Sequence, residues 1–284
     1  GCTALLLIGF GLQDSLLPIV DKQTSQLTHN DMTVSFRDEK ALINEGGLAD
    51  ALKQAGTVDS WGVFYVKSTT LYNEAGDSAE ISVVGAQKDA DMTSCFTFRT
   101  RKDHEEIPFD DSSVILTEKT ALNLGVKVGD TLYVEGTDGR RVPVTLTGIT
   151  ENYMFTRLYL SNAQLKSYLD GEPAWNTVYG LTHCKNDTEY NALRARLLEC
   201  SYVSGVSFTE DTNSMFDNLI VSLNSVVVLI IVCAAALAAV VLYNLISVNL
   251  AERKKELATI KVLGFYDKEV YRYIFREIEL LALI

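Results

Sequence analysis

The chain has 284 residues, of which 47% are hydrophobic, and a formal net charge of -12. Most of this charge lies between residues 13 and 218, where 31 acidic residues outnumber 18 basic ones. An acidic surface repels nucleic acid phosphates, so the composition argues against nucleic acid as a partner.

The first twelve residues carry no ionisable side chain apart from the thiol of Cys2. A secretory signal peptide would begin with a basic region, which this chain lacks. We therefore expect residues 1–12 to be the outer end of a first transmembrane helix. The chain then reads as a fragment that begins and ends inside membrane helices.

Residues 13–218 show short alternating segments and turn signals, which predict a mixed α+β domain. Strands are expected at 33–37, 61–66, 79–84, 131–135 and 142–147. Asp138-Gly139 between the last two predicts a hairpin, because such turns require positive φ. Pro143 lacks an amide donor and predicts an edge or bulged strand.

Helical segments are expected between these strands. They are 41–54, 117–124, 161–169 and 187–200. Ser161 and Asp187 are candidate N-caps, and glycines follow several of the predicted helix ends. About 200 residues of this kind can bury a core of their own.

The predicted domain lacks the side-chain spacing of a catalytic or metal site. His29, His104 and His183 are far apart and form no metal-ligand motif. Acidic residues cluster at 103–106 and 110–111, and we interpret them as a solvated loop. Cys184 and Cys200 could pair or remain free. We therefore expect no cofactor, no metal and no enzymatic activity, and a domain that acts as a binding or mechanical module.

Residues 219–246 form an uncharged stretch long enough to cross a bilayer as a helix. A buried core helix would be shorter and would have a charged face. Small residues recur at four-residue spacing within it, which favours close packing against another helix. These are Ala234, Ala235, Ala238 and Ala239. Their alternative role is simply to favour a helix.

Basic residues follow this stretch, seven of them within residues 247–284. Lys and Arg next to a membrane helix mark its cytoplasmic side. We therefore expect residues 13–218 to be extracytoplasmic and 247–277 to be cytoplasmic. Residues 278–284 would be the truncated start of a further transmembrane helix.

The cytoplasmic stretch predicts a helix, a break at Gly264 and a second helix that Asp267 caps. Leu250, Leu257, Ile260 and Leu263 fall near one side of the first helix. This helix–Gly–helix segment forms an elbow, and physical reasoning alone leaves two roles open for it. It could dock a cytoplasmic partner, or it could lie on the lipid surface.

The run Ala251–Phe265, directly after a membrane helix, resembles the FtsX-like permease family. Glu252, Arg253, Glu256 and Gly264 match the E-R-x-x-E pattern and the later glycine of that family. Residues 114–132, with the Gly129-Asp130 turn, are similar to the extracytoplasmic core domain of MacB-type members. Residues 1–23 look like the end of the first helix in large Firmicutes-type members.

The resemblance implies a permease subunit of an ABC transporter, in which a partner ATPase hydrolyses ATP. The segment after the membrane helix would touch this ATPase and transmit motion to the extracytoplasmic domain. Its implied contacts are Glu252, Arg253, Glu256, Leu257, Ile260 and Gly264. Export or extraction of a lipid, a peptide or a similar substrate would follow.

Further implied partners are the lipid bilayer, another permease repeat or a second permease copy, and an extracellular substrate or protein. The competing hypothesis is a membrane-anchored extracellular sensor that signals to a cytoplasmic partner. It predicts two membrane helices followed by a signalling domain.

Overall fold

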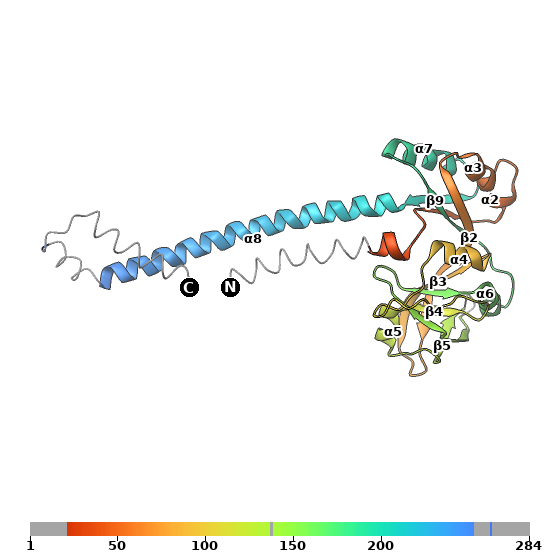
Figure 1. The fold of residues 1–284 in the computed structure, drawn as a ribbon, viewed down its shortest axis with the longest axis horizontal. Coiled ribbons are helices and arrows are strands. Elements are labelled where there is room, and N and C mark those ends of the chain that lie inside the picture. The colour runs from red at the N-terminus through yellow and green to blue at the C-terminus, as the bar shows by residue number, and fades with distance from the viewer. Residues whose placement is uncertain (1–21, 137–138, 253–261, 263–284) are drawn as a thin grey trace. The chain divides into compact units, whose positions relative to one another are not determined.

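The computed structural model describes residues 22–136, 139–252 and 262. The chain divides into two compact units. The larger is Ser15–Asn218, and the smaller combines Gly1–Asp14 with Leu219–Ile284. Figure 1 shows strands and short helices together in the larger unit, which confirms the predicted α+β class.

Among the described residues the strands are β1 (Met32–Phe36), β2 (Val58–Tyr72), β3 (Ser78–Ala86), β4 (Val114–Thr117), β5 (Thr131–Glu135), β6 (Arg141–Thr145), β7 (Gly148–Thr150), β8 (Arg157–Leu160), β9 (Thr177–Thr182) and β10 (Val203–Phe208). The helices are the π-helical η1 (Lys22–Leu27) and the α-helices α2 (Lys40–Ile43), α3 (Leu48–Gln54), α4 (Asp89–Cys95), α5 (Glu118–Leu124), α6 (Asn162–Leu169), α7 (Asp187–Leu198) and α8 (Thr209–Glu252).

The strands form one mixed sheet in the order β10-β1-β9-β2-β3-β8-β4-β7, and β5 joins it through β2. The fifteen-residue β2 organises this sheet. Its first half pairs with β9 and its second half with β3, in both cases antiparallel. In Figure 1, β2 runs from the part that carries α2, α3 and α7 to the part that carries α5 and α6. One strand thus links both parts of the domain.

Two clusters of buried side chains form the core. The larger is mainly aliphatic and includes Leu48, Leu71 and Leu116, all fully buried. The smaller is rich in aromatic rings, and in it the ring of Tyr179 lies 4.8 Å from that of Phe64. Edge-to-face ring pairs add to the stabilisation that burial provides.

The strands expected from alternation are confirmed, although β2 is much longer than its predicted core at 61–66. β5 and β6 form the predicted hairpin, and Gly139 has the positive φ, 78°, that such a turn needs. Asp138 lies outside the described residues. Among the described strands, β6 pairs only with β5. This confirms the prediction that Pro143 lies on an edge strand.

The single helix predicted over 41–54 is wrong. The chain forms α2 and α3 instead, with Gly46 at φ +70° between them. The pair Gly46-Gly47 was the signal for this break. A Cβ on Gly47 would lie 2.5 Å from the carbonyl oxygen of Ala41, so the chain needs glycine to turn so tightly.

The predicted caps are partly confirmed. Ser161 accepts a hydrogen bond from the amide of Gln164, and Gly125 ends α5 in the left-handed conformation. The cap of α7 is Asn186 rather than Asp187, since the amide side chain accepts from the N–H of Glu189. α6 ends on Asp170, not on the glycine that follows it.

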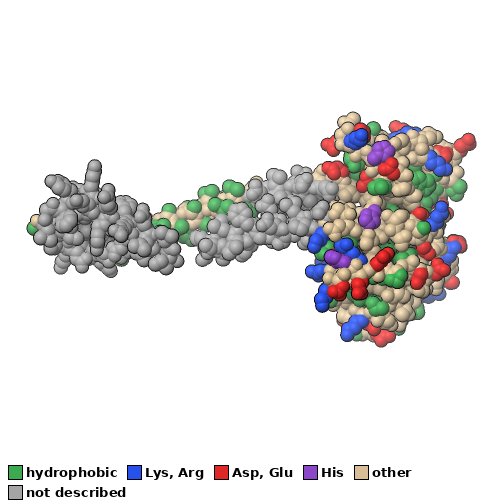
Figure 2. All heavy atoms as spheres, viewed as in Figure 1, with side chains coloured by type: hydrophobic (Ala, Val, Ile, Leu, Met, Phe, Trp, Pro, Cys, Tyr) green, Lys and Arg blue, Asp and Glu red, His purple; other side chains and the backbone are tan. Residues whose placement is uncertain are grey.

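The helix α8 begins in the larger unit and continues into the smaller one. Within it, Ser225–Val248 is apolar and long enough to cross a membrane. Its outward side chains include exposed large hydrophobics such as Leu229, Val232 and Leu237. Hydrophobic side chains are visible along this helix in Figure 2, whereas the larger unit displays charged ones. The predicted limits of the span, 219–246, remain a prediction.

Candidate functional site

The predicted cytoplasmic contact residues fall mostly outside the described part of the chain. Glu252 is the last residue of α8. Arg253, Glu256, Leu257, Ile260 and Gly264 lie outside the described residues, so their roles remain predictions.

The four alanines predicted to pack against another helix all lie on α8. Ala234 is buried, with 7% of its surface exposed. Ala235, Ala238 and Ala239 are exposed. Their role in helix packing also remains a prediction.

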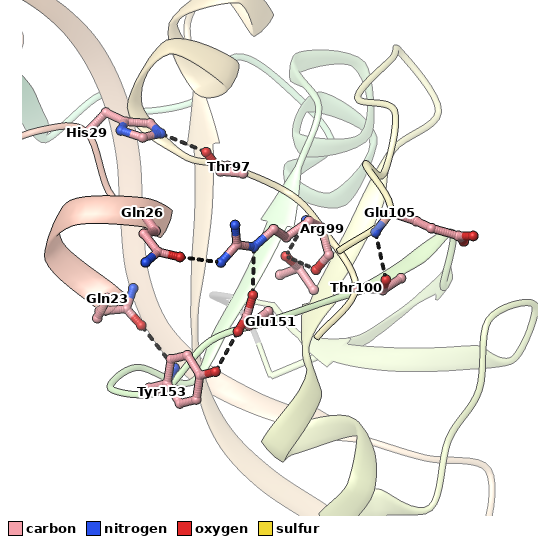
Figure 3. A network of polar contacts seen from close by, with 10 residues as sticks. Gln23, Gln26, His29, Thr97, Arg99, Thr100, Glu105, Glu151 and Tyr153 are labelled. Atoms are coloured by element: carbon pink, nitrogen blue, oxygen red, sulfur yellow. Dashed lines mark hydrogen bonds and ion pairs between the residues drawn. The ribbon is translucent and has the colours of Figure 1, made fainter. Parts of the chain in front are cut away.

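A network of polar side chains surrounds η1, the segment through which the chain enters the larger unit. The side chain of Gln23 is buried, and its oxygen accepts from the backbone amide of Tyr153 at 2.9 Å. Its Nε2 donates to the hydroxyl of Thr28 at 3.1 Å. Three positions after Gln23, Gln26 accepts from Nη2 of Arg99 at 2.8 Å. Figure 3 shows Gln23 reaching from η1 to Tyr153 and Gln26 reaching to Arg99.

Arg99 and Glu151 form the centre of this network (Figure 3). Nε of Arg99 donates to Oε2 of Glu151 at 2.7 Å, and the hydroxyl of Tyr153 donates to the other carboxylate oxygen. The backbone amide of Glu151 also donates to the carbonyl of Arg99 at 2.8 Å. The network therefore joins η1, the segment after α4 and the loop between β7 and β8.

The charge of Glu151 is stabilised although its side chain is only 2% exposed. Burial by itself raises the pKa of this carboxyl, but the hydrogen bonds from Tyr153 and Arg99 and the charge of Arg99 lower it. Together they hold the pKa below its ordinary value. The pKa of Tyr153 is raised, first by burial and then by its contact with Glu151. At neutral pH the carboxylate of Glu151 is therefore ionised, while the hydroxyl of Tyr153 keeps its proton and donates it to this carboxylate.

Backbone hydrogen bonds also attach η1 and the residues that follow it, here called the entry segment, to the rest of the domain. The amide of Thr97 donates to the carbonyl of Leu27 at 3.0 Å, and the amide of His29 donates to Cys95 at 2.8 Å. Nε2 of His29 lies 2.7 Å from the hydroxyl of Thr97, as Figure 3 shows. The entry segment is therefore held by its backbone as well as by its side chains.

A second set of contacts holds the exit, where β10 passes directly into α8. The amide of Thr209, the first residue of α8, donates to the carbonyl of Asp31 at 2.7 Å. Asp211 accepts from the amide of Phe208 and from Arg194, the latter at 2.6 Å. Asp211 in the first turn also complements the positive end of the helix dipole.

Asp31 connects the exit with the sheet. Its carboxylate accepts from both the amide and the hydroxyl of Thr182, at 2.7 and 2.6 Å. Burial nevertheless raises the pKa of Asp31 above its ordinary value. Asp31 follows η1 closely in the sequence, so the entering and leaving segments are fixed to adjacent parts of the same sheet.

Within the described residues, His, Cys, Asp and Glu form no group that could hold a metal ion. The acidic loop residues Asp103, Glu105, Glu106, Asp110 and Asp111 are exposed. The thiols of Cys184 and Cys200 are free.

The network around Arg99 and Glu151 had no signal in the sequence. Gln26 and Arg99 are 73 positions apart, and Arg99 and Glu151 are 52 apart. No spacing rule connects residues so distant, and single charged residues in loops are ordinarily exposed.

Comparisons with known proteins show similarity in two parts of the chain. The model of the FtsX-like permease C-terminal region matches residues 228–284. No curated protein matches the chain. Solved structures with a similar fold include the periplasmic region of MacB from Actinobacillus actinomycetemcomitans, which is 13% identical, with a TM-score of 0.40. That match covers 68% of this chain and 94% of the other.

A second solved structure is the extracellular domain of the noncanonic ABC-type transporter YknZ from Gram-positive bacteria. It is 15% identical, with a TM-score of 0.39, and the match covers 63% of this chain and 98% of that one. The sequence match over 228–284 includes the apolar part of α8 and the residues that follow it. This match covers the C-terminal part of the chain, which is similar there to the FtsX-like permease family.

Proposed function

We propose that the chain is the permease subunit of an ABC transporter of the FtsX/MacB type. In this proposal, a cytoplasmic ATPase drives motion that the membrane helices pass to an extracytoplasmic domain. The observation that carries the proposal is the family match over residues 228–284, which begins inside the candidate membrane span Ser225–Val248.

The proposed orientation places the larger unit outside the cytoplasm. The residues after α8 include Arg253, Lys254 and Lys255. Basic residues at the end of a membrane helix favour the cytoplasmic side. The acidic region 13–218 then faces outward, and the chain crosses the membrane more than once.

The anchoring of the larger unit supports a mechanical role. A mobile attachment would absorb the motion of a membrane helix, whereas a fixed attachment passes it on. The entry segment is held by the ion pair of Arg99 with Glu151 and by Gln23. The exit is held through Thr209 and Asp211. Displacement of either segment would thus move the sheet to which it is fixed.

The proposed ATPase contact is the segment that begins at the end of α8. Glu252, Arg253 and Glu256 would form polar contacts with the ATPase, and Leu257 and Ile260 would supply an apolar face. Gly264 would set the angle of the elbow. ATP hydrolysis belongs to the partner, and the substrate is a lipid, a peptide or a similar molecule.

Co-purification tests the proposal directly. The full-length permease and its candidate ATPase are co-expressed, and the ATPase retained on the tagged permease is measured. We expect retention with the native chain and a loss of at least tenfold with the combined Glu252→Ala, Arg253→Ala and Glu256→Ala variant. Charged hydrogen bonds across an interface contribute this much when several are removed together.

A matched control removes the same charges from the larger unit. Arg37, Glu74 and Glu80 are exposed there. Their combined change to alanine should leave retention unchanged. If no ATPase associates with the native full-length chain, the permease proposal fails and the extracellular sensor becomes the better explanation.

A further inference from the structure

A cavity of about 290 Å³ lies in the larger unit between the entering and leaving segments. Its walls come from η1, the loop before β8, the strands β8, β9 and β10, and the first residue of α8. The lining residues that matter most are Gln23, Asn30, Phe155, Arg157 and Thr209. The volume is close to the lower end of the range for small-molecule sites.

Two residues that line this cavity each have a buried polar atom without a hydrogen-bond partner. These atoms are Nη1 of Arg157 and Oδ1 of Asn30, and they are the only such side-chain atoms in the described part of the chain. Buried polar groups in proteins are nearly always paired, so each exception needs an explanation. An unpaired donor and an unpaired acceptor on two lining residues of one cavity point to a single ligand that pairs with both.

The surroundings of Arg157 leave its charge without a counter-ion. Its guanidinium lies 4.3 Å from the ring centre of Phe155 and 5.4 Å from that of Phe96. The phenols of Tyr159 and Tyr179 are its other electrostatic partners. Among the described residues no Asp or Glu forms an ion pair with it. A buried cation of this kind is costly unless an anion joins it.

The unpaired atoms define the chemistry of the ligand. The guanidinium fork of arginine matches a carboxylate in two parallel hydrogen bonds. Oδ1 of Asn30 requires a donor such as a hydroxyl or an ammonium group. Gln23 does not compete, because its oxygen and its nitrogen are already bonded to Tyr153 and Thr28.

We propose that this cavity binds a small carboxylate that also carries a hydroxyl or ammonium group. The cavity wall includes η1 and Thr209, so the ligand contacts both the entering and the leaving segment. Binding would stabilise the arrangement in which both segments are fixed to the sheet. This site goes beyond the proposed permease role and does not depend on the ATPase.

Calorimetric titration of the complete chain in detergent micelles tests the site. The probes are lactate and glycine, which have both groups, acetate, which has only the carboxylate, and inorganic phosphate. We expect saturable binding of lactate or glycine at least tenfold tighter than that of acetate. Saturable binding of phosphate alone, or of no probe, would overturn the proposal.

Variants distinguish a ligand site from a structural arginine. Arg157→Lys keeps the positive charge but removes the two parallel N–H donors of the guanidinium. This variant should therefore bind the probe at least tenfold more weakly. The matched control is Arg141→Lys, because Arg141 also lies over a ring, that of Tyr72 at 3.7 Å, but is exposed on β6. It should bind like the native chain. Equal binding by Arg157→Lys and the native chain would refute the assignment.

Stability without ligand gives an independent readout. Arg157→Met and Asn30→Ala each remove an unpaired polar atom, so the unliganded chain should unfold at the same or a higher temperature than the native chain. Both variants should lose the shift that lactate or glycine produces. If both instead unfold at a clearly lower temperature, these side chains are structural and the proposal fails.

Discussion

Arg99 and Glu151 form an ion pair with 2.7 Å between Nε and Oε2, although the side chain of Glu151 is only 2% exposed. The carboxylate also accepts from Tyr153, and Gln26 accepts from the guanidinium. A buried pair of this kind contributes little relative to an apolar pair, but each partner depends on the other. Loss of one leaves a buried charge that nothing compensates.

Arg99→Ala should therefore lower the free energy of unfolding of the larger unit by about 3 kcal/mol. Urea titration followed by tryptophan fluorescence measures this, since Trp61 and Trp175 both lie in that unit. The matched control is Arg101→Ala. The Arg101–Glu118 pair spans 3.4 Å and the side chain of Arg101 is 58% exposed, so the loss should stay below about 1 kcal/mol. Similar losses in both variants would contradict the prediction.

The same carboxylate predicts a specific pH dependence. The folded pKa of Glu151 lies below its ordinary value of 4.5. Its stabilising contribution is therefore complete above about pH 4.5, and it is lost as the pH falls through the folded pKa. The difference in unfolding free energy between the native chain and Glu151→Gln should be constant at neutral pH and should shrink below pH 4.5.

The comparison with Glu151→Gln is needed because other carboxyls act in the opposite direction. Burial raises the pKa of Asp31 and of Asp91. A raised pKa favours the folded state as the pH falls, and it partly masks the loss at Glu151. Both groups are present in both proteins, so the difference isolates Glu151. A difference that stays constant down to pH 3 would show that the carboxylate is not stabilised by its partners.

Local patterns allowed the main elements of the fold to be predicted, because alternation and caps act over a few residues. The hairpin of β5 and β6 and the cap at Ser161 are examples. The break at Gly46-Gly47 was missed, since helical periodicity continues on both sides of it. The cap of α7 was placed one residue late, because Asn186 and Asp187 are both good capping residues.

The polar site could not be predicted, for a different physical reason. Its partners come from three separate segments, and only the completed sheet brings Gln23, Arg99 and Glu151 together. The same holds for the cavity with Arg157. By contrast, the resemblance to the FtsX-like permease family could be seen in the run that begins at Ala251, because that pattern is contiguous in the sequence.

The cysteines of the larger unit should differ strongly in reactivity. Cys95 is 8% exposed, and burial raises its pKa to about 11. Cys184 and Cys200 are partly exposed free thiols, although burial also raises the pKa of Cys200. Because the thiolate is the reactive form, iodoacetamide at pH 8 should modify Cys184 first and Cys95 at least tenfold more slowly.

Mass spectrometry of peptides from the folded chain measures the three rates. Labelling after unfolding in urea is the control and should make them similar. Equal rates in the folded chain would mean that Cys95 is accessible. Failure to label either Cys184 or Cys200 without a reductant would indicate that these two residues pair.

The break between α2 and α3 predicts a contrast between two glycines. A Cβ on Gly47 would lie 2.5 and 2.8 Å from the carbonyl oxygens of Ala41 and Asn44, and backbone atoms cannot move aside cheaply. Gly47→Ala should therefore cost about 1–3 kcal/mol of unfolding free energy. A Cβ on Gly56, just after α3, would meet nothing within 4 Å, and its φ lies outside the left-handed region.

Gly56→Ala should accordingly be neutral or stabilise the larger unit by up to about 1 kcal/mol, because alanine restricts the unfolded chain. Urea titrations of the two variants beside the native chain give the comparison. Both glycines flank the same short helix, so a general weakness of α3 would affect them alike. Opposite signs identify the tight turn at Gly47 as the cause, and equal losses would show that the turn does not need glycine.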